Sequence, residues 1–333
     1  MGAAIDYGKI MTRAFETTRK YRALWLFGIL LALFGGGSGG NFNFGNLPSG
    51  GGGRDRDWGD LPTMPAVSSE TWQLVTILIG ALVCFFLVWL LLSIILRFVS
   101  RAALIGLVQE LEANESQPTV KRGFSIGVER FWKLLGIALV IHIPLAVISL
   151  GLILLAALPL LAALVPLVNA GRTAPRELVG IVVAGGVGSL ALICCVALFL
   201  ALVGLIIHPF YEFIVRVCVI KKSGVMDSIR EGYRIVRSNL GNIAVLYILA
   251  IGIGIGFGLL MIPIALILIV IPAAAGLLVY LLANSVTSAV VAGVVLGVPM
   301  LLILLFISGL YCVFQSAYWT EGYLAVTTGK SEG

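Results

Sequence analysis

Five apolar blocks, each long enough to cross a lipid bilayer, dominate this chain. They cover residues 74–96, 134–168, 178–207, 243–282 and 289–311. A helix of about 20 residues crosses a hydrocarbon core roughly 30 Å thick, and every block exceeds that length. The chain has 60% hydrophobic and only 11% charged residues, whereas ordinary soluble domains carry about 25% charged residues. The sequence therefore predicts an all-α, multi-pass membrane protein and excludes a soluble globule.

A motif that recurs at an interval of 109 residues predicts how the spans are organised. A small residue followed by an aromatic residue stands at Ala14-Phe15, Gly123-Phe124 and Gly232-Tyr233. Basic residues precede each pair and an apolar stretch follows it, and a fixed long period indicates a duplicated unit. We therefore expect three pseudo-repeats, about 5–101, 118–216 and 227–317. Each contains a basic amphipathic interfacial helix and a transmembrane hairpin, which makes six spans in a single integral membrane domain, residues 1–333.

Two stretches of the chain depart from a simple span. Residues 35–71 contain eleven glycines and too little apolar surface to offset the entropy of ordering, so they predict a flexible outer loop. The first span, from about Tyr21 to Gly36, is short. Pro144, Pro159 and Pro166 interrupt the third span, which predicts either a kinked helix or a span followed by a separate piece.

The distribution of Lys and Arg predicts the orientation. Eighteen of the 22 Lys and Arg residues lie in residues 1–22, 97–133, 214–239 and the tail, and four lie in the intervening loops. Because cytoplasmic loops carry the excess of Lys and Arg, we expect both termini on the cytoplasmic side of a prokaryotic inner membrane. The charge is spread over interfacial helices, so it does not indicate nucleic-acid binding.

The basic segments have two interpretations. They set topology and anchor the chain at lipid headgroups, or they recognise an anionic lipid or an acidic protein partner. The candidate residues for contact with anionic headgroups are Arg13, Arg19, Lys121, Arg122, Arg230 and Arg234.

The two histidines are the candidates for an intramembrane polar site. His142 and His208 lie in apolar stretches, and with Tyr211 and Glu212 they predict a polar cluster between the third and fourth spans. Ionisable residues inside a membrane are functional candidates. The alternative is structural, because the imidazoles could hydrogen-bond carbonyls freed by Pro144 and Pro209.

Catalytic and cofactor signatures are missing from the sequence. The chain has no H-E-x-x-H, no G-x-S-x-G and no paired aspartates, and two histidines are too few ligands for a metal site. We therefore expect no enzyme activity, no cofactor and no metal. Apart from the histidines, the apolar blocks hold no acid or base, which disfavours an ion-coupled transporter. The overlapping G-x-x-x-G patterns at Gly252–Gly258 and at Gly293–Gly297 predict close helix packing within the monomer.

The repeated unit closes on Phe98-x-x-Arg101 and again on Phe213-x-x-Arg216. In this pattern the chain resembles the six-span membrane domains of uncharacterised prokaryotic families. It is similar in pattern to the membrane domain attached to some glycerophosphoryl diester phosphodiesterases. Those enzymes carry a separate catalytic barrel, for which this chain has neither the length nor the His, Glu and Asp residues, so the resemblance implies architecture alone.

The sequence thus favours a non-enzymatic membrane scaffold or accessory protein that binds lipids or another membrane protein. The alternative is a carrier for a neutral or amphiphilic solute, which would use the Pro-interrupted spans around Pro159 and Pro263.

Overall fold

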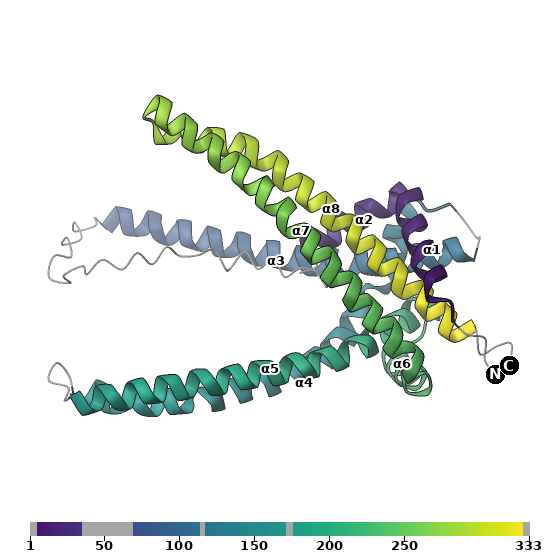
Figure 1. Ribbon diagram of the computed structural model, residues 1–333, viewed down its shortest axis with the longest axis horizontal. Coiled ribbons are helices and arrows are strands. Elements are labelled where there is room, and N and C mark those ends of the chain that lie inside the picture. Colours follow the sequence, from purple (N-terminus) through teal and green to yellow (C-terminus); the bar gives the residue numbers. More distant parts are fainter. Residues whose placement is uncertain (1–4, 35–68, 114–116, 171–175, 329–333) are drawn as a thin grey trace. The chain divides into compact units, whose positions relative to one another are not determined.

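The computed structural model describes residues 5–34, 69–113, 117–170 and 176–328, and this part of the chain is helical. Within it lie eight helices (Figure 1): α1 (Tyr7–Lys20), α2 (Arg22–Phe34), α3 (Ser69–Glu112), α4 (Val120–Ala170), α5 (Arg176–Ile220), α6 (Val225–Ser238), α7 (Leu240–Ala283) and α8 (Val286–Thr328). The expected all-α class is confirmed. The flexible loop predicted over residues 35–71 lies almost wholly outside the described residues.

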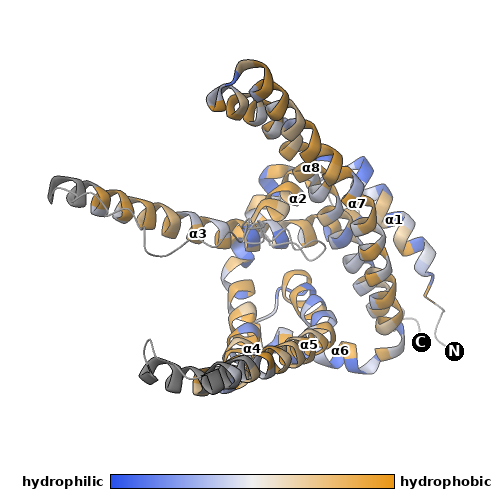
Figure 2. Ribbon diagram, turned by 60° about the vertical axis from the view of Figure 1, so that its left-hand side comes forward, coloured by the Kyte–Doolittle hydropathy of each residue, from blue (hydrophilic) through white to orange (hydrophobic). Residues whose placement is uncertain are grey.

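Five of the described helices are long and apolar enough to cross a membrane. They are Val75–Glu112, Val120–Pro159, Ala184–Ile220, Leu240–Ala283 and Val286–Thr328. Figure 2 shows these helices coloured as hydrophobic along much of their length, and their most apolar windows are almost entirely exposed, which suits contact with lipid tails. The length and composition of these helices support a multi-pass membrane protein.

The one expected span that is missing from these five is the first along the chain. It corresponds to α2, which is shorter than the others. Its 13 residues extend about 20 Å at 1.5 Å per residue, less than a hydrocarbon core of about 30 Å. The six-span arrangement in three hairpins and the orientation of the termini therefore stay predictions.

The chain divides into two compact units. The first unit comprises Met1–Ile10, Val128–Leu249 and Trp319–Gly333, and the second comprises Met11–Gly127 and Ala250–Tyr318. Each unit is described separately below.

In the second unit, small residues let the helices approach closely. A Cβ added at Gly28 of α2 would collide with the Gly309 carbonyl of α8, and one added at Gly309 would lie 2.9 Å from the Ile29 Cα. Phe27, which is fully buried, packs its ring 5.2 Å from that of Phe124. The buried run Ala102–Val108 of α3 completes this core.

In the first unit, the core lies where α5 meets α6 and the end of α8. Phe213, Val215 and Val217 of α5 are fully buried, as is Trp319 of α8. The outer parts of α4 and α5 run side by side in both views (Figures 1 and 2). There the Ser189 hydroxyl donates to the Ala156 carbonyl over 3.0 Å.

The structure explains why the recurring pairs start with a small residue. Ala14, Gly123 and Gly232 are all buried, and a Cβ at Gly232 would lie 2.9 Å from the Ile214 Cα. By contrast, Phe15 and Tyr233, which follow the small residue, are exposed. The small residue is thus the helix contact. The aromatic residue is exposed in the first and third pairs, whereas Phe124 of the second pair packs against Phe27.

The three basic segments join the following long helices in different ways, and their position at the membrane interface stays a prediction. α1 ends before Tyr21 and α6 ends before Asn239, whereas the residue midway between them in the 109-residue period, Arg130, lies inside α4. Side chains satisfy the carbonyls freed at the two breaks. The Trp25 indole donates to the Thr18 carbonyl (2.7 Å), and the Asn239 amide donates to the Ile235 carbonyl (3.0 Å).

The prolines do not divide the long helices into separate pieces. α4 continues past Pro144 and Pro159, and α7 continues past Pro263 and Pro272. A span followed by a separate piece, one of the two expectations for the third span, is therefore wrong. Membrane helices tolerate proline when neighbouring groups take over the hydrogen bonding of the freed backbone.

Only some glycines of the G-x-x-x-G patterns in α7 and α8 contact another helix of the monomer. A Cβ added at Gly254 would lie 3.3 Å from the Tyr311 hydroxyl, and Gly293 and Gly297 lie against Pro272. Around Gly252, Gly256 and Gly258 the structure has open space.

A glycine-to-alanine pair tests the close contact between α5 and α6. We expect Gly232→Ala to lower the free energy of unfolding by about 1–3 kcal/mol, the usual cost of overpacking. The measurement is thermal unfolding of the full chain in detergent. The matched control is Gly204→Ala in α5, where nothing lies within 4 Å. It should leave stability unchanged or raise it by up to about 1 kcal/mol. Equal melting temperatures for the two variants would contradict the contact.

Candidate functional site

Three ionisable side chains at intervals of four residues line one face of α5. The Glu212 carboxylate accepts a 2.5 Å hydrogen bond from the Arg216 guanidinium, which also donates to the Glu212 backbone carbonyl over 2.8 Å. The His208 Nε2 lies 3.6 Å from the other Glu212 oxygen. The side chains of Arg216 and Glu212 are 2% and 7% exposed, whereas that of His208 is 32% exposed. A buried charge pair thus carries a partly accessible imidazole at one end.

Aromatic rings from α7 and α8 surround this row within the first unit. Tyr247 stacks on the His208 ring at 5.7 Å, and Trp319 lies 6.0 Å from the same ring. The Arg216 guanidinium lies 6.0 Å from the Trp319 ring centroid, a distance at which a cation is attracted to the ring face. Tyr323 is 1% exposed and packs 5.8 Å from Phe213. These rings exclude water from the charge pair.

The structure joins the four predicted polar residues in two pairs. His208 contacts Glu212 as described, and the His142 ring meets the Tyr211 ring edge-on at 5.2 Å. The His142 Nδ1 also lies 2.9 Å from the Ala138 carbonyl. That carbonyl is four residues back on the helix. Pro144 instead removes the donor to the Val140 carbonyl, so the proposed link between His142 and the proline gap is wrong for this histidine.

Sequence reasoning missed three members of the site. Arg216 was assigned to the basic flank, although its spacing of four residues from Glu212 is the signal of an ion pair on one helix face. Tyr247 and Trp319 come from other helices, and nothing local in the sequence connects them to His208. The chemistry of the site is that of a buried ion pair, since the Glu212 carboxylate accepts a hydrogen bond from Arg216. In the described part of the chain, no group of three or more His, Cys, Asp or Glu residues is arranged to hold a metal ion.

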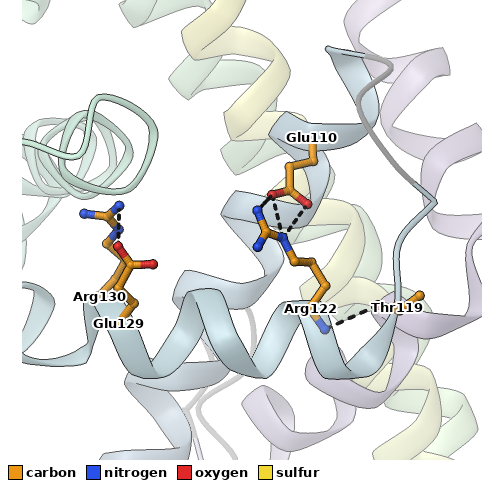
Figure 3. Close-up of polar contacts among 5 residues, drawn as sticks. All are labelled: Glu110, Thr119, Arg122, Glu129 and Arg130. Atoms are coloured by element: carbon orange, nitrogen blue, oxygen red, sulfur yellow. Dashed lines mark hydrogen bonds and ion pairs between the residues drawn. The ribbon is translucent and has the colours of Figure 1, made fainter.

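The basic candidates divide into paired and outward-facing residues. Within the second unit, Arg13 lies 3.3 Å from the Glu112 carboxylate. Arg122 lies 2.7 Å from the Glu110 carboxylate, a pair that Figure 3 shows. Arg19, Lys121 and Arg230 are exposed. Arg234 is 79% exposed and only 3.9 Å from Glu231. Arg19, Lys121 and Arg230 are therefore the best placed to contact an anionic headgroup, because, among the described residues, no carboxylate paired with them offsets their charge.

The apolar stripe of the short amphipathic helices faces the protein. On α6 the buried residues are Ser228, Gly232 and Val236, and on α1 they include Ile10, Ala14 and Thr18. We expected these helices to lie on the membrane, and the structure corrects which face is free for it. The outward faces carry Phe15 beside Arg19, and Tyr233 beside Arg230 and Arg234.

Comparison with known sequences and structures yields one match. The sequence model described as a family of unknown function (DUF7544) matches residues 4–325, so the chain belongs to that family. No curated protein and no solved structure matches the chain. The family match provides no link to the membrane domain of the glycerophosphoryl diester phosphodiesterases, whose pattern the sequence resembles.

A double-mutant cycle tests the buried pair. We expect Glu212→Leu alone to cost about 3–5 kcal/mol of folding free energy, because it leaves the Arg216 charge buried without its carboxylate. Adding Arg216→Met should recover most of that loss, since an apolar pair of similar volume needs no charge compensation. Thermal unfolding in detergent is measured for Glu212→Leu, for Arg216→Met and for the double variant. A double variant as unstable as the sum of the two single variants would show that the two charges do not depend on each other.

Proposed function

We propose that this member of the DUF7544 family is a non-enzymatic membrane scaffold or accessory protein whose basic segments bind anionic lipid headgroups. The observation that carries the proposal is the outward face of α1 and α6. There, exposed arginines stand beside an exposed aromatic ring. Aromatic side chains favour the headgroup level of a bilayer, and each Lys or Arg near an anionic surface contributes about 1 kcal/mol.

The burial pattern agrees with a binding role for these helices. An amphipathic helix that only anchored the chain would bury its apolar stripe in lipid. Here the stripe is used for packing on the protein, so the helix is held rigidly and presents its cations in a set orientation. The buried charges of α5 are committed to each other, which supports a structural role for them.

The proposal includes the finer topology. We place six spans in three hairpins in a prokaryotic inner membrane, with α2 as the short first span and both termini cytoplasmic. The support is the excess of Lys and Arg in the segments between hairpins. Under this topology the outward cations of α1 and α6 meet the cytoplasmic leaflet, whose anionic lipids give it a negative surface potential.

A carrier for a neutral or amphiphilic solute is the second candidate. One observation favours it: the His208 imidazole is partly exposed beside a buried carboxylate, and an ionisable group within an apolar helix is a functional candidate. It predicts solute flux in proteoliposomes that falls with His208→Ala. The same variant should leave lipid enrichment unchanged.

Lipid enrichment tests the scaffold proposal. The protein is extracted with its native lipid patch, and the co-purified lipids are quantified by mass spectrometry. We expect Arg19→Gln with Arg230→Gln to reduce the enrichment of anionic lipid about tenfold or more, since two cations near the surface contribute roughly 2 kcal/mol.

The control removes a paired cation together with its partner. Arg122→Gln with Glu110→Gln deletes an ion pair without changing the net charge, so the enrichment should persist. Unchanged enrichment in the first double variant, or a stoichiometric protein partner with only bulk lipid, would overturn the lipid-binding role.

A further inference from the structure

In the first unit, α4 carries exposed apolar residues on one side, both within the apolar block 134–168 and just before it. Leu139, Ile143 and Val147 are exposed, and at 100° per residue they share one side of the helix. The same side continues toward the N-terminus through Val128 and Trp132, which are 62% and 75% exposed. Between Trp132 and Leu139 the residues are buried or half-buried. The exposed apolar side of α4 therefore has two parts, and the part near the N-terminus contains Trp132, a residue type that prefers the membrane interface.

The turn between α5 and α6 is fastened beside α4 at the same level. The Lys133 ammonium donates to the Lys222 carbonyl over 3.2 Å. One turn further along α4, Gly136 contacts Val225, since a Cβ at Gly136 would lie 3.1 Å from its side chain. Lys222 holds this turn with a φ of 57°, in the left-handed region. The exposed Met226 follows on α6.

Two of the four cations in this region are neutralised by carboxylates. Arg130 pairs with Glu129 at 3.0 Å, as Figure 3 shows, and Lys221 pairs with Glu231 at 2.6 Å. Lys133 uses one of its three donors on a neutral carbonyl, and the side chain of Lys222 is exposed. Among the described residues, neither lysine has an ion pair with a carboxylate. Asp227, in the first turn of α6, is the remaining nearby acid.

We propose that Val128, Trp132 and Met226, together with Lys133 and Lys222, form an interfacial patch that binds anionic phospholipid. The rings and methyl groups enter the boundary between headgroups and acyl chains, and the two ammonium groups contact the phosphate. The occupant is a lipid because Val128 and Trp132 lie on the same side of α4 as the exposed apolar residues of its span. It is an anionic lipid because the cations without a carboxylate partner lie at the interfacial end of that face. The inference assigns a site to the proposed lipid binding, and the biological role of this site rests on that proposed function.

Fluorescence quenching of Trp132 tests the patch in the full chain. The protein is reconstituted in phosphatidylcholine vesicles containing an equal fraction of either brominated phosphatidylglycerol or brominated phosphatidylcholine. The Trp132 signal is the difference between the wild-type protein and Trp132→Phe. We expect brominated phosphatidylglycerol to quench this signal more strongly. In Lys133→Gln with Lys222→Gln the excess should be lost, because about 1 kcal/mol per lysine corresponds to roughly fivefold in local enrichment.

The matched control is Lys221→Gln, which removes a lysine of the same turn that is already paired with Glu231. It should retain the excess quenching. Equal quenching by the two lipids, no quenching by either, or an excess that survives loss of both lysines would overturn the patch. Enrichment of anionic lipid in the native extract is measured independently, so it can persist when the patch fails, and the patch can hold when that enrichment is absent.

Discussion

Close approach of helix backbones at small residues is the contact on which both units of this protein depend. In the first unit Gly232 rests against the backbone of Ile214, and in the second Gly28 rests against Gly309. In a bilayer the lipid tails are as apolar as leucine, so burying apolar surface between helices yields little, and dispersion contacts at short range must hold them together. A glycine or alanine allows that range. The same requirement explains why the 109-residue repeat preserves a small residue at Ala14, Gly123 and Gly232.

The charges of the protein follow a similar division between inside and outside. Glu212 and Arg216 are buried and form an ion pair, and the Trp319 ring lies beside the guanidinium. A buried pair of this kind is costly to break, although its net contribution to stability can be small. By contrast, Arg19 of α1 and Arg230 of α6 are exposed. Arg13 and Arg122, which the sequence places in the same class, are partly neutralised by the two carboxylates at the end of α3.

Much of the fold class could be predicted from the sequence because apolar length and helical geometry are local properties. That α4 continues as one helix, whereas α1 and α6 end, could not be predicted. A break at Tyr21 or Asn239 depends on a side chain that reaches the freed carbonyls. In the first case that side chain is Trp25, which also packs against Phe306 of α8.

The sequence by itself determined that the chain is helical, that it is built for a membrane and that basic residues flank its spans. These features depend on the number and order of apolar and charged residues, which the bilayer sorts without regard to tertiary contacts. Only the tertiary structure decided which cations are paired and which face of α1 and α6 is free. It also decided that Tyr247 and Trp319 lie against His208. Those relations join residues distant in sequence, and their energies depend on distance and burial, neither of which a linear pattern contains.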